Sequence, residues 1–203
     1  MNELSITISQ CGLNFLLDLE MQTASVIGKA DDNEDSEITI PISIKYESDD
    51  FVIKSVNKGS FQGTTTVKSI LFPTDSQVSV IEEDAFADSL IEHLVIPTSV
   101  TDLQDGWCRC TPKLFKIMIM PKNERYIYLD NEIILGKPHL TCDEYKDLVF
   151  VRRDAKYVKF PSFISQISSY AFSDSKIEQI YIASDISQIS KGAFYNCQQL
   201  TNR

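Results

Sequence analysis

The 203-residue chain is poor in several residue types, and each shortage argues against a class of function. Its seven glycines form no phosphate-cradling loop and no dinucleotide fingerprint. Basic residues are outnumbered by acidic ones, 19 to 29, so the formal net charge is −10. A nucleic acid or an anionic membrane is therefore a poor partner. No stretch approaches the roughly 20 apolar residues of a membrane span.

Sequence signals of a secreted protein are also few. The first basic residue is Lys29, whereas the n-region of a signal peptide is positively charged. The five cysteines are an odd number spread over the whole chain, and no Asn-x-Ser/Thr sequon occurs. Neither a disulfide framework nor glycosylation is indicated, which favours a reducing compartment.

What the chain does contain is a repeat. The segment "AFADSLIEHLVIP" at 85–97 returns as "AFSDSKIEQIYIA" at 171–183, with identity at seven of thirteen positions. Apolar runs close at Pro41, Pro73, Pro97, Pro121, Pro161 and Ala183, with spacings after Pro73 of 24, 24, 40 and 22 residues. Periods of roughly 20 to 29 residues are typical of leucine-rich repeats, whose coils bury their apolar sides against one another. We predict a β-rich repeat solenoid with short helical or irregular return segments.

Two apolar patterns predict the interior of this solenoid. Positions one, three and six before a closing residue alternate as the inward side of a strand does. They are Ile96, Leu94 and Ile91; Met120, Met118 and Phe115; Ile182, Ile180 and Ile177. The return segments carry an aromatic row, predicted to pack in the core, which consists of Phe61, Phe86, Trp107, Phe172 and Phe194.

The 40-residue spacing contains more than one coil. Its segment "NERYIYLDNEIILGK" alternates around Asp130-Asn131, a pair suited to the left-handed geometry of a two-residue hairpin turn. The N-terminal "LNFLLDLEMQTASVIG" predicts strand, turn and strand, which would cap the first coil. We predict one domain over 1–203, with an N-terminal cap at 1–40, repeats at 41–121, a hairpin insert at 122–155, and repeats at 156–203. The strand expected after Leu200 is missing, so we expect an unfinished C-terminal end.

Several segments together resemble the BspA-like leucine-rich repeat proteins, in particular their protist surface-antigen branch. The segments are "VIEEDAFADSLIEHLVIP", "GWCRCTPKLFKIMIMPKNERYIYLDNEIILGK", "YKDLVFVRRD" and "ISQISKGAFYNCQQL", within about residues 38–203. The resemblance implies a cell-surface adhesion or recognition protein with a protein partner, such as a host surface or matrix protein, and no catalytic residues or cofactor. Trp107 and Cys108 depart from the usual Ala-Phe pair, Ala183 replaces a proline, and no membrane anchor follows the repeats.

The strand alternation also predicts a binding face. Residues two and four before each closing position should point away from the core. The candidate binding residues are Leu71, His93, Val95, Ile117, Ile119, Tyr157, Lys159 and Tyr181. Such a face is more apolar than solubility requires, and contiguous apolar surface often marks an interaction site. The alternative is ordinary cross-strand packing, which also favours β-branched and aromatic residues.

Two enzymatic alternatives and one further binding role remain open. Cys108, Cys110, His139 and Cys142 have the ligand types of a zinc site, but the repeat expects small apolar core groups at Cys108 and Cys110. A Cys142–His139 nucleophile pair has no evident third group to orient the histidine, and neighbouring acidic residues disfavour a thiolate. An intracellular interaction scaffold is the other binding role. We predict a non-enzymatic module with no metal and no cofactor; the sequence does not predict its oligomeric state.

Overall fold

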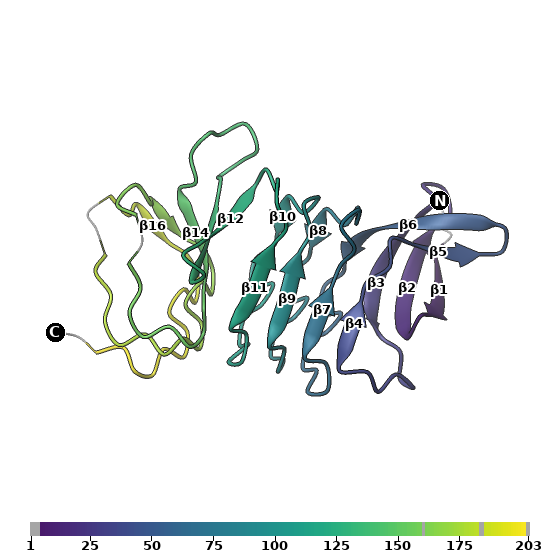
Figure 1. Cartoon of the computed structure of the whole chain (residues 1–203), viewed down its shortest axis with the longest axis horizontal. Helices are drawn as coiled ribbons and strands as arrows, with labels where there is room; N and C mark the ends of the chain where they lie inside the picture. Colours follow the sequence, from purple (N-terminus) through teal and green to yellow (C-terminus); the bar gives the residue numbers. More distant parts are fainter. Residues whose placement is uncertain (1–4, 160, 183–184, 202–203) are drawn as a thin grey trace.

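Successive repeats place their short strands side by side along an elongated molecule (Figure 1). The structure, a computed structural model, describes residues 5–159, 161–182 and 185–201. The described residues contain no helix, and hence none that is long and apolar enough to span a membrane. The strands are β1 (Ser5–Gln10), β2 (Leu13–Asp18), β3 (Thr23–Lys29), β4 (Glu37–Thr39), β5 (Ser43–Tyr46), β6 (Asp49–Val56), β7 (Ser69–Leu71), β8 (Val80–Ile81), β9 (His93–Ile96), β10 (Asp102–Leu103), β11 (Lys116–Ile119), β12 (Tyr126–Leu129), β13 (Ile133–Gly136), β14 (Asp147–Val151), β15 (Gln166–Ile167) and β16 (Gln188–Ile189).

The strands that precede the first four closing prolines form one parallel sheet in the order β11-β9-β7-β4. We call it the front sheet. Its inward side chains Ile70, Leu94 and Ile96 are fully buried, as the alternation predicts. Proline follows β7 and β9 because it has no N–H to give to a sheet ladder and suits the point where the chain turns away.

A second sheet is built from the N-terminal strands and the return segments, in the order β1-β2-β3-β6-β8-β10, with β5 paired to β6. The antiparallel pair β2–β3 confirms the predicted strand, turn and strand near the N-terminus. β3 then joins β6 in parallel, and β6 is followed by the short return strands β8 and β10. Phe15 and Leu17 of β2 are fully buried, so this hairpin covers the open side of the first repeats.

A third sheet repeats the same plan in the order β12-β13-β14-β15-β16. The antiparallel pair β12–β13 confirms the predicted hairpin. Asp130 and Asn131 have φ of 52° and 55°, and Glu132 N–H donates to Leu129 O at 3.0 Å. β14 pairs with β13 antiparallel and with β15 in parallel. A hairpin therefore starts this sheet too, and the long spacing before Pro161 is explained.

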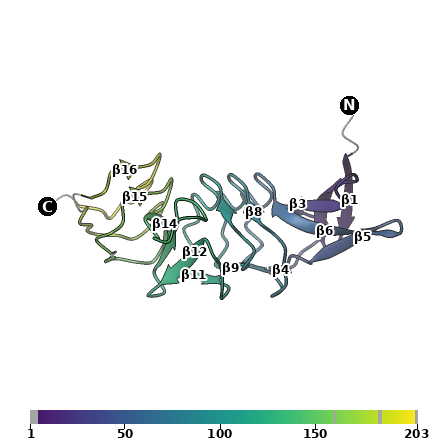
Figure 2. The ribbon, with the colours of Figure 1, turned by 90° about the horizontal axis from the view of Figure 1, so that it is seen from above.

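The β13–β14 pair separates two hydrophobic cores. Ile134 and Phe150 belong to the core of the first repeats, whereas Ile133, Leu135 and Leu148 belong to the core of the last ones. Both faces of the pair are buried because successive side chains of a strand point to opposite sides. In Figure 1, β12 and β14 lie between β11 and β16. Figure 2 shows β14 between β12 and the strands β15 and β16. We call residues 5–121 the N-terminal block and residues 122–201 the C-terminal block.

The predicted aromatic row runs through both cores. Ring centroids are 5.7 Å apart for Phe61 and Phe86, 6.5 Å for Phe86 and Trp107, and 4.8 Å for Phe172 and Phe194. The prediction is confirmed, although Phe194 is only partly buried. Phe150 extends the first row, with its ring centroid 6.2 Å from that of Trp107, and it was not predicted from the sequence.

Candidate interaction surface

The outward side of the front sheet consists of two rows of side chains. His93 and Val95 lie on this side, because Leu94 and Ile96 point into the core. In the register of the sheet, Leu71, Val95 and Met118 are neighbours in one row. Val95 is only 3% exposed in that row, whereas Met118 is 49% exposed. The expectation that Val95 is exposed is therefore wrong, because it belongs to the core of the N-terminal repeats. Met118 is the most accessible apolar side chain of this row.

The predicted orientation of Ile117 and Ile119 is wrong. β11 pairs with β9 so that Ile117 lies opposite Leu94 and Ile119 opposite Ile96. The place equivalent to Pro97 is thus Met120, not Pro121, and a slip of one residue turns every side chain to the other face. Ile117 is 5% exposed and Ile119 packs against the core. Met118 and Phe115, expected inside, are 49% and 46% exposed.

A signal for this register is present in the sequence. A strand that points Met118 and Met120 inward also points Lys116 inward, because residues two apart share a face. A buried, unpaired lysine is costly, so Lys116 marks the outward face and leaves the interior to Ile117 and Ile119.

The predicted binding residues of the C-terminal block are exposed. Tyr157 is 62% and Tyr181 84% exposed, and Lys159 is exposed as well. Tyr157 and Gln179 form an isolated parallel bridge, and Tyr157 OH donates to Glu178 Oε2 at 2.7 Å. This hydrogen bond raises the pKa of Tyr157 and lowers the pKa of Glu178.

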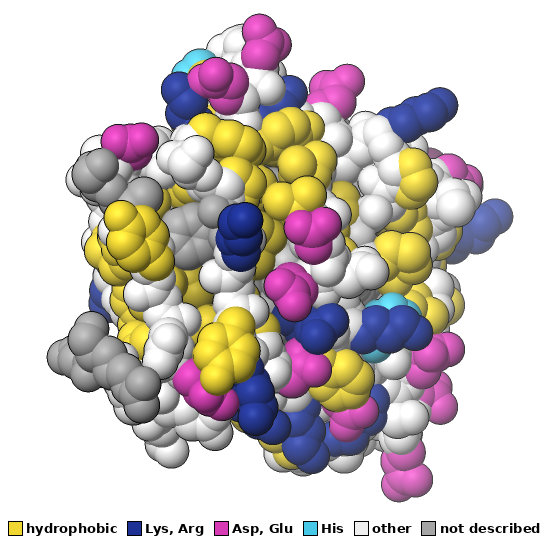
Figure 3. Space-filling model, turned by 60° about the vertical axis from the view of Figure 1, so that its left-hand side comes forward, with side chains coloured by type: hydrophobic (Ala, Val, Ile, Leu, Met, Phe, Trp, Pro, Cys, Tyr) yellow, Lys and Arg dark blue, Asp and Glu magenta, His cyan; other side chains and the backbone are white. Residues whose placement is uncertain are grey.

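Exposed apolar side chains are frequent in this block. Figure 3, in which the C-terminal end comes forward, shows hydrophobic side chains among charged ones of both signs. Ile182, predicted to point inward, is 40% exposed, while Ile180 is half-buried and Ile177 fully buried. Ala183, taken as the last closing position, lies outside the described residues. Apart from Tyr157, Tyr181 and Ile182, the exposed large apolar side chains that the structure describes in this block are Leu140, Phe163, Ile189 and Tyr195.

The predicted rows do not run without interruption from one block to the other. The front sheet ends at β11, and no β-pairing among the described residues joins β11 to residues 156–159. Leu71, His93 and Val95 therefore belong to one surface, and Tyr157, Lys159 and Tyr181 to another.

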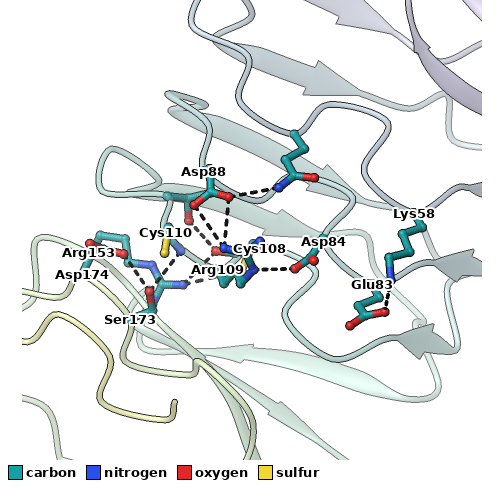
Figure 4. A network of polar contacts seen from close by, with 12 residues as sticks. Lys58, Glu83, Asp84, Asp88, Cys108, Arg109, Cys110, Arg153, Ser173 and Asp174 are labelled. Atoms are coloured by element: carbon teal, nitrogen blue, oxygen red, sulfur yellow. Dashed lines mark hydrogen bonds and ion pairs between the residues drawn. The ribbon is translucent and has the colours of Figure 1, made fainter. Parts of the chain in front are cut away.

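The two blocks meet at a buried arginine (Figure 4). Cys108 occupies the place at which neighbouring repeats have Phe86 and Phe172, which leaves room in the core. Arg153, 1% exposed, fills this room. Its guanidinium donates to Ala171 O at 2.9 Å and to Cys108 O at 3.3 Å, and its Cζ lies 4.4 Å from the Phe150 ring centroid. Arg153 thus ties a repeat of the N-terminal block to one of the C-terminal block.

The electrostatics of this junction follow from burial. Arg153 makes no ion pair within the described part of the chain, and burial lowers its pKa. Burial raises the pKa of the Cys108 thiol to about 12, although the neighbouring Arg153 opposes the shift. Cys108 is therefore a neutral thiol at physiological pH, and its sulfur, 3.6 Å from Arg153 Nη2, serves as a weak acceptor.

Two further polar contacts at or near the junction are also structural. Cys110 N–H donates to Ser173 Oγ at 3.0 Å, which joins the two blocks. Arg109 pairs with Asp84 at 2.6 Å and with Asp88 at 3.0 Å, and so connects two repeats of the N-terminal block (Figure 4). Burial is the main cause that raises the pKa of Cys110.

The structure does not bring the four candidate zinc ligands together. Cys108 and Cys110 hold the junction, whereas His139 and Cys142 lie together in the loop between β13 and β14. Among the described residues, no group of three or more histidine, cysteine or acidic side chains could hold a metal ion.

The histidine and cysteine of that loop are in contact. Cys142 Sγ lies 3.1 Å from His139 Nε2, and Thr141 Oγ1 lies 2.7 Å from His139 Nδ1. The third group that the sequence did not reveal is therefore Thr141. A pocket of about 300 Å³ beside the thiol is lined by Cys142, Asp143, Glu144 and Lys146.

A smaller cavity of about 80 Å³ lies where the second and third sheets separate. Arg125 and Asp147 line it, and Arg125 Nε and Asp147 Oδ1 are buried there without a protein hydrogen-bond partner. Burial raises the pKa of Asp147. The cavity is large enough for several water molecules and smaller than the pockets of roughly 300 Å³ or more that bind cofactors and drug-sized ligands.

Comparisons with known proteins bear on this architecture. The family model of the BspA type leucine-rich repeat region matches residues 36–130 and 141–203, in six copies. No curated protein sequence matches the chain at a significant level.

Three solved structures share the fold. The pneumococcal vaccine antigen PcpA is 15% identical over 97% of this chain and 69% of that chain, with a TM-score of 0.58. A leucine-rich repeat protein from Eubacterium ventriosum is 18% identical over 97% of this chain and 71% of its own, with a TM-score of 0.57. A leucine-rich cell surface protein from Faecalibacterium prausnitzii is 14% identical over 96% and 75%, with a TM-score of 0.52.

Proposed function

Because the chain belongs to the BspA-type leucine-rich repeat family, we propose that it is a non-enzymatic protein-binding module in which a solenoid of repeats presents an interaction surface. Repeat arrays use extended surfaces of this kind to bind other proteins. The buried positions of Cys108 and Arg153 support a structural role for the groups that could otherwise suggest chemistry.

The proposed binding site is the surface formed by Tyr157, Lys159, Gln179 and Tyr181, which we call the tyrosine surface. The observation that carries the proposal is the exposure of Tyr157 and Tyr181, 62% and 84%, at neighbouring positions of adjacent repeats. Tyrosine is enriched among the residues that dominate protein interfaces, because it combines a large apolar ring with a polar hydroxyl. Lys159 would supply a charge to the rim.

The outward side of the front sheet is the second part of the proposed site. We assign Leu71, His93 and Val95 to this part, with Met118 in the same row. Since Val95 is nearly buried, this part would contribute shape complementarity and less binding energy than the tyrosine surface.

The finer proposal is adhesion at a cell surface, with a host surface or matrix protein as the partner. Two observations support it: one protein of the same fold is a vaccine antigen and another is a cell surface protein. Antibody staining of intact and permeabilised cells tests the location. Equal staining supports the cell surface, and staining that requires permeabilisation contradicts it.

The binding proposal is tested with paired variants. Tyr157→Glu with Tyr181→Glu alters the tyrosine surface, and Leu71→Glu with Met118→Glu alters the front sheet. Leu140→Glu changes a residue of the insert with 48% exposure and serves as the matched control. Each folded protein is immobilised, exposed to a matrix-protein extract, and the captured proteins are quantified by mass spectrometry. We expect a partner that the parent and the Leu140 variant capture and that the tyrosine variant loses. Equal capture by the tyrosine variant contradicts the proposal.

A further inference from the structure

The loop between β13 and β14 contains a thiol in contact with a base. Cys142 N–H donates to His139 O at 3.0 Å, and this turn brings both side chains to the same side. Cys142 Sγ then lies 3.1 Å from His139 Nε2. Of the five cysteines, the described structure places only Cys142 in hydrogen-bond contact with a histidine.

The contact with Thr141 is compatible with the tautomer of His139 in which Nε2 is the base. A neutral imidazole carries its proton on one nitrogen, and the hydrogen bond of that nitrogen fixes the tautomer. Thr141 Oγ1, 2.7 Å from Nδ1, can accept the proton of Nδ1–H. Nε2 then has a free lone pair that faces the Cys142 thiol, which is the arrangement of an activated nucleophile.

The thiol is open to reagents. Cys142 is partly exposed and His139 exposed, and the adjoining pocket of about 300 Å³ leaves room for a small molecule. Cys108, by contrast, is fully buried and Cys110 half-buried. These positions have structural explanations, whereas the contact between Cys142 and His139 has no evident role in folding.

We propose that Cys142 is a nucleophilic thiol, with His139 as its base and Thr141 as the positioning residue, and that it reacts with small disulfides. Nε2 takes the thiol proton while Sγ attacks one sulfur of the disulfide. A new S–S bond joins Cys142 to one half of the reagent, and the S–S bond of the reagent breaks. The leaving thiolate receives the proton from the imidazolium. Cys142 is thereby oxidised and the other half of the disulfide is reduced to a thiol, so the step needs no further oxidant.

The charges around the pocket select among disulfides. Asp143 and Glu144 line it together with Lys146, and Lys146 Nζ pairs with Glu144 at 2.6 Å. Lys137, at the end of β13, lies over the Tyr145 ring at 5.2 Å. Lys146 offsets the charge of Glu144, whereas the charge of Asp143 is not offset within the pocket lining. The site therefore repels an anionic reagent and favours a neutral or cationic disulfide.

The test compares two thiols of the same molecule. Cys11 lies exposed in the turn between β1 and β2 and, within the described residues, has no hydrogen bond to a histidine. The full chain is treated with the neutral bis(hydroxyethyl) disulfide or the dianionic dithiodipropionate, and peptide mapping gives the rate at each cysteine. A positioned base accelerates proton transfer by roughly 100-fold or more in enzymes. On this exposed loop we expect Cys142 to react about tenfold faster than Cys11 with the neutral reagent, and the advantage to shrink with the anionic one.

Variants of the base and of its partner make the proposal specific. His139→Gln keeps a polar side chain without a base and should lower the Cys142 rate to about that of Cys11. Thr141→Val should lower the rate, and Thr141→Ser should restore it. Cys108 reports folding in every sample, because a folded chain keeps it unreactive. Equal rates for Cys142 and Cys11 in the parent, or an unchanged ratio in His139→Gln, overturn the proposal, whatever the outcome of the binding experiments.

Discussion

The N-terminal and C-terminal blocks contain nearly the same repeat motif and bury it to different extents. In the N-terminal block, Phe61, Phe86 and Trp107 are 2%, 0% and 4% exposed. In the C-terminal block, Phe172 is fully buried, whereas its neighbour Phe194 is only partly buried and Ile189 of β16 is 49% exposed. Since the motifs match, the difference arises from the neighbours of each repeat.

Those neighbours are visible in the sheets. The N-terminal block has the β2–β3 hairpin at one end and the strands β12, β13 and β14 of the C-terminal block at the other (Figure 1). The C-terminal block begins with these three strands, and among the described residues no strand pairs with the outer edge of β16. The stability of a repeat depends on its own contacts and on those with adjacent repeats. Among the described residues, the last repeats of the C-terminal block contact fewer neighbours than Phe61, Phe86 and Trp107 do, and more of their apolar surface is exposed.

The largest expected effect sharpens this comparison. Phe86→Ala and Phe172→Ala remove fully buried rings and should each lower the free energy of unfolding by about 3–5 kcal/mol. Phe194→Ala removes a partly buried ring and should cost about half as much. Urea titrations of the three variants measure these values. Equal losses for Phe194 and Phe172 would contradict the difference in burial.

The next effect concerns the junction. Arg153→Ala removes the hydrogen bonds to Ala171 O and Cys108 O and empties the space that the side chain fills, which should cost about 2–3 kcal/mol. Both carbonyls keep a second hydrogen bond, from Val151 N–H and Thr111 Oγ1. Arg153→Met keeps the volume and removes a buried charge, so it should cost less. The Ala variant should also unfold in two steps, with the C-terminal block first, as followed by calorimetry and by Trp107 fluorescence. A single sharp transition would contradict the role of Arg153 as the connection.

A pH effect of intermediate size follows from Cys108. The pKa of Cys108 is about 12 in the folded chain and 9.0 for an ordinary thiol. Above pH 9 the thiol loses its proton more readily in the unfolded chain, which favours the unfolded state. Below pH 9 this thiol does not change the free energy of unfolding. Between pH 9 and 12 it lowers the free energy of unfolding by about 1.4 kcal/mol per pH unit. Cys108→Ala should therefore be less sensitive than the parent when unfolding is compared at pH 8 and pH 10. The same loss in both proteins would show that Cys108 does not ionise on unfolding.

The smallest expected effect on stability belongs to the tyrosine surface. Tyr157→Glu and Tyr181→Glu change exposed side chains and should alter the free energy of unfolding by less than about 0.5 kcal/mol. Val95→Glu, on the outward side of the front sheet but nearly buried, should cost several times more. Chemical denaturation separates the two cases, and a large loss for the tyrosine variants would assign these rings to the core of the block.

The period, the aromatic row and the hairpin could be predicted from the sequence because each depends on local geometry. Asp130 and Asn131 both adopt the positive φ that their side chains tolerate. The register of β11 could not be read from Pro121, because both phases of "FKIMIMP" are mainly apolar and only Lys116 distinguishes them. The contact of Arg153 with Cys108 spans 45 residues. The small Cys108 indicates a space in the core but not the side chain that fills it.

The positions of the candidate binding residues could be predicted only in part, for a similar reason. Alternation along a strand places Tyr157 and Tyr181 on the outside, as the structure does, but it does not reveal that the insert interrupts the rows between the blocks. Thr141 was missed because its contact with His139 depends on a loop conformation that no periodic pattern encodes.

Hydrogen exchange tests the difference between the blocks most directly. The amides of β7 and β9 lie in a continuous parallel ladder, whereas residues 156–159 and 176–182 share a single isolated bridge, between Tyr157 and Gln179. Local opening is easier where few contacts hold the backbone. We predict that β7 and β9 exchange about 100-fold more slowly than residues 176–182 under native conditions. Equal protection of the two segments would contradict the account of a fully covered N-terminal block and a partly covered C-terminal one.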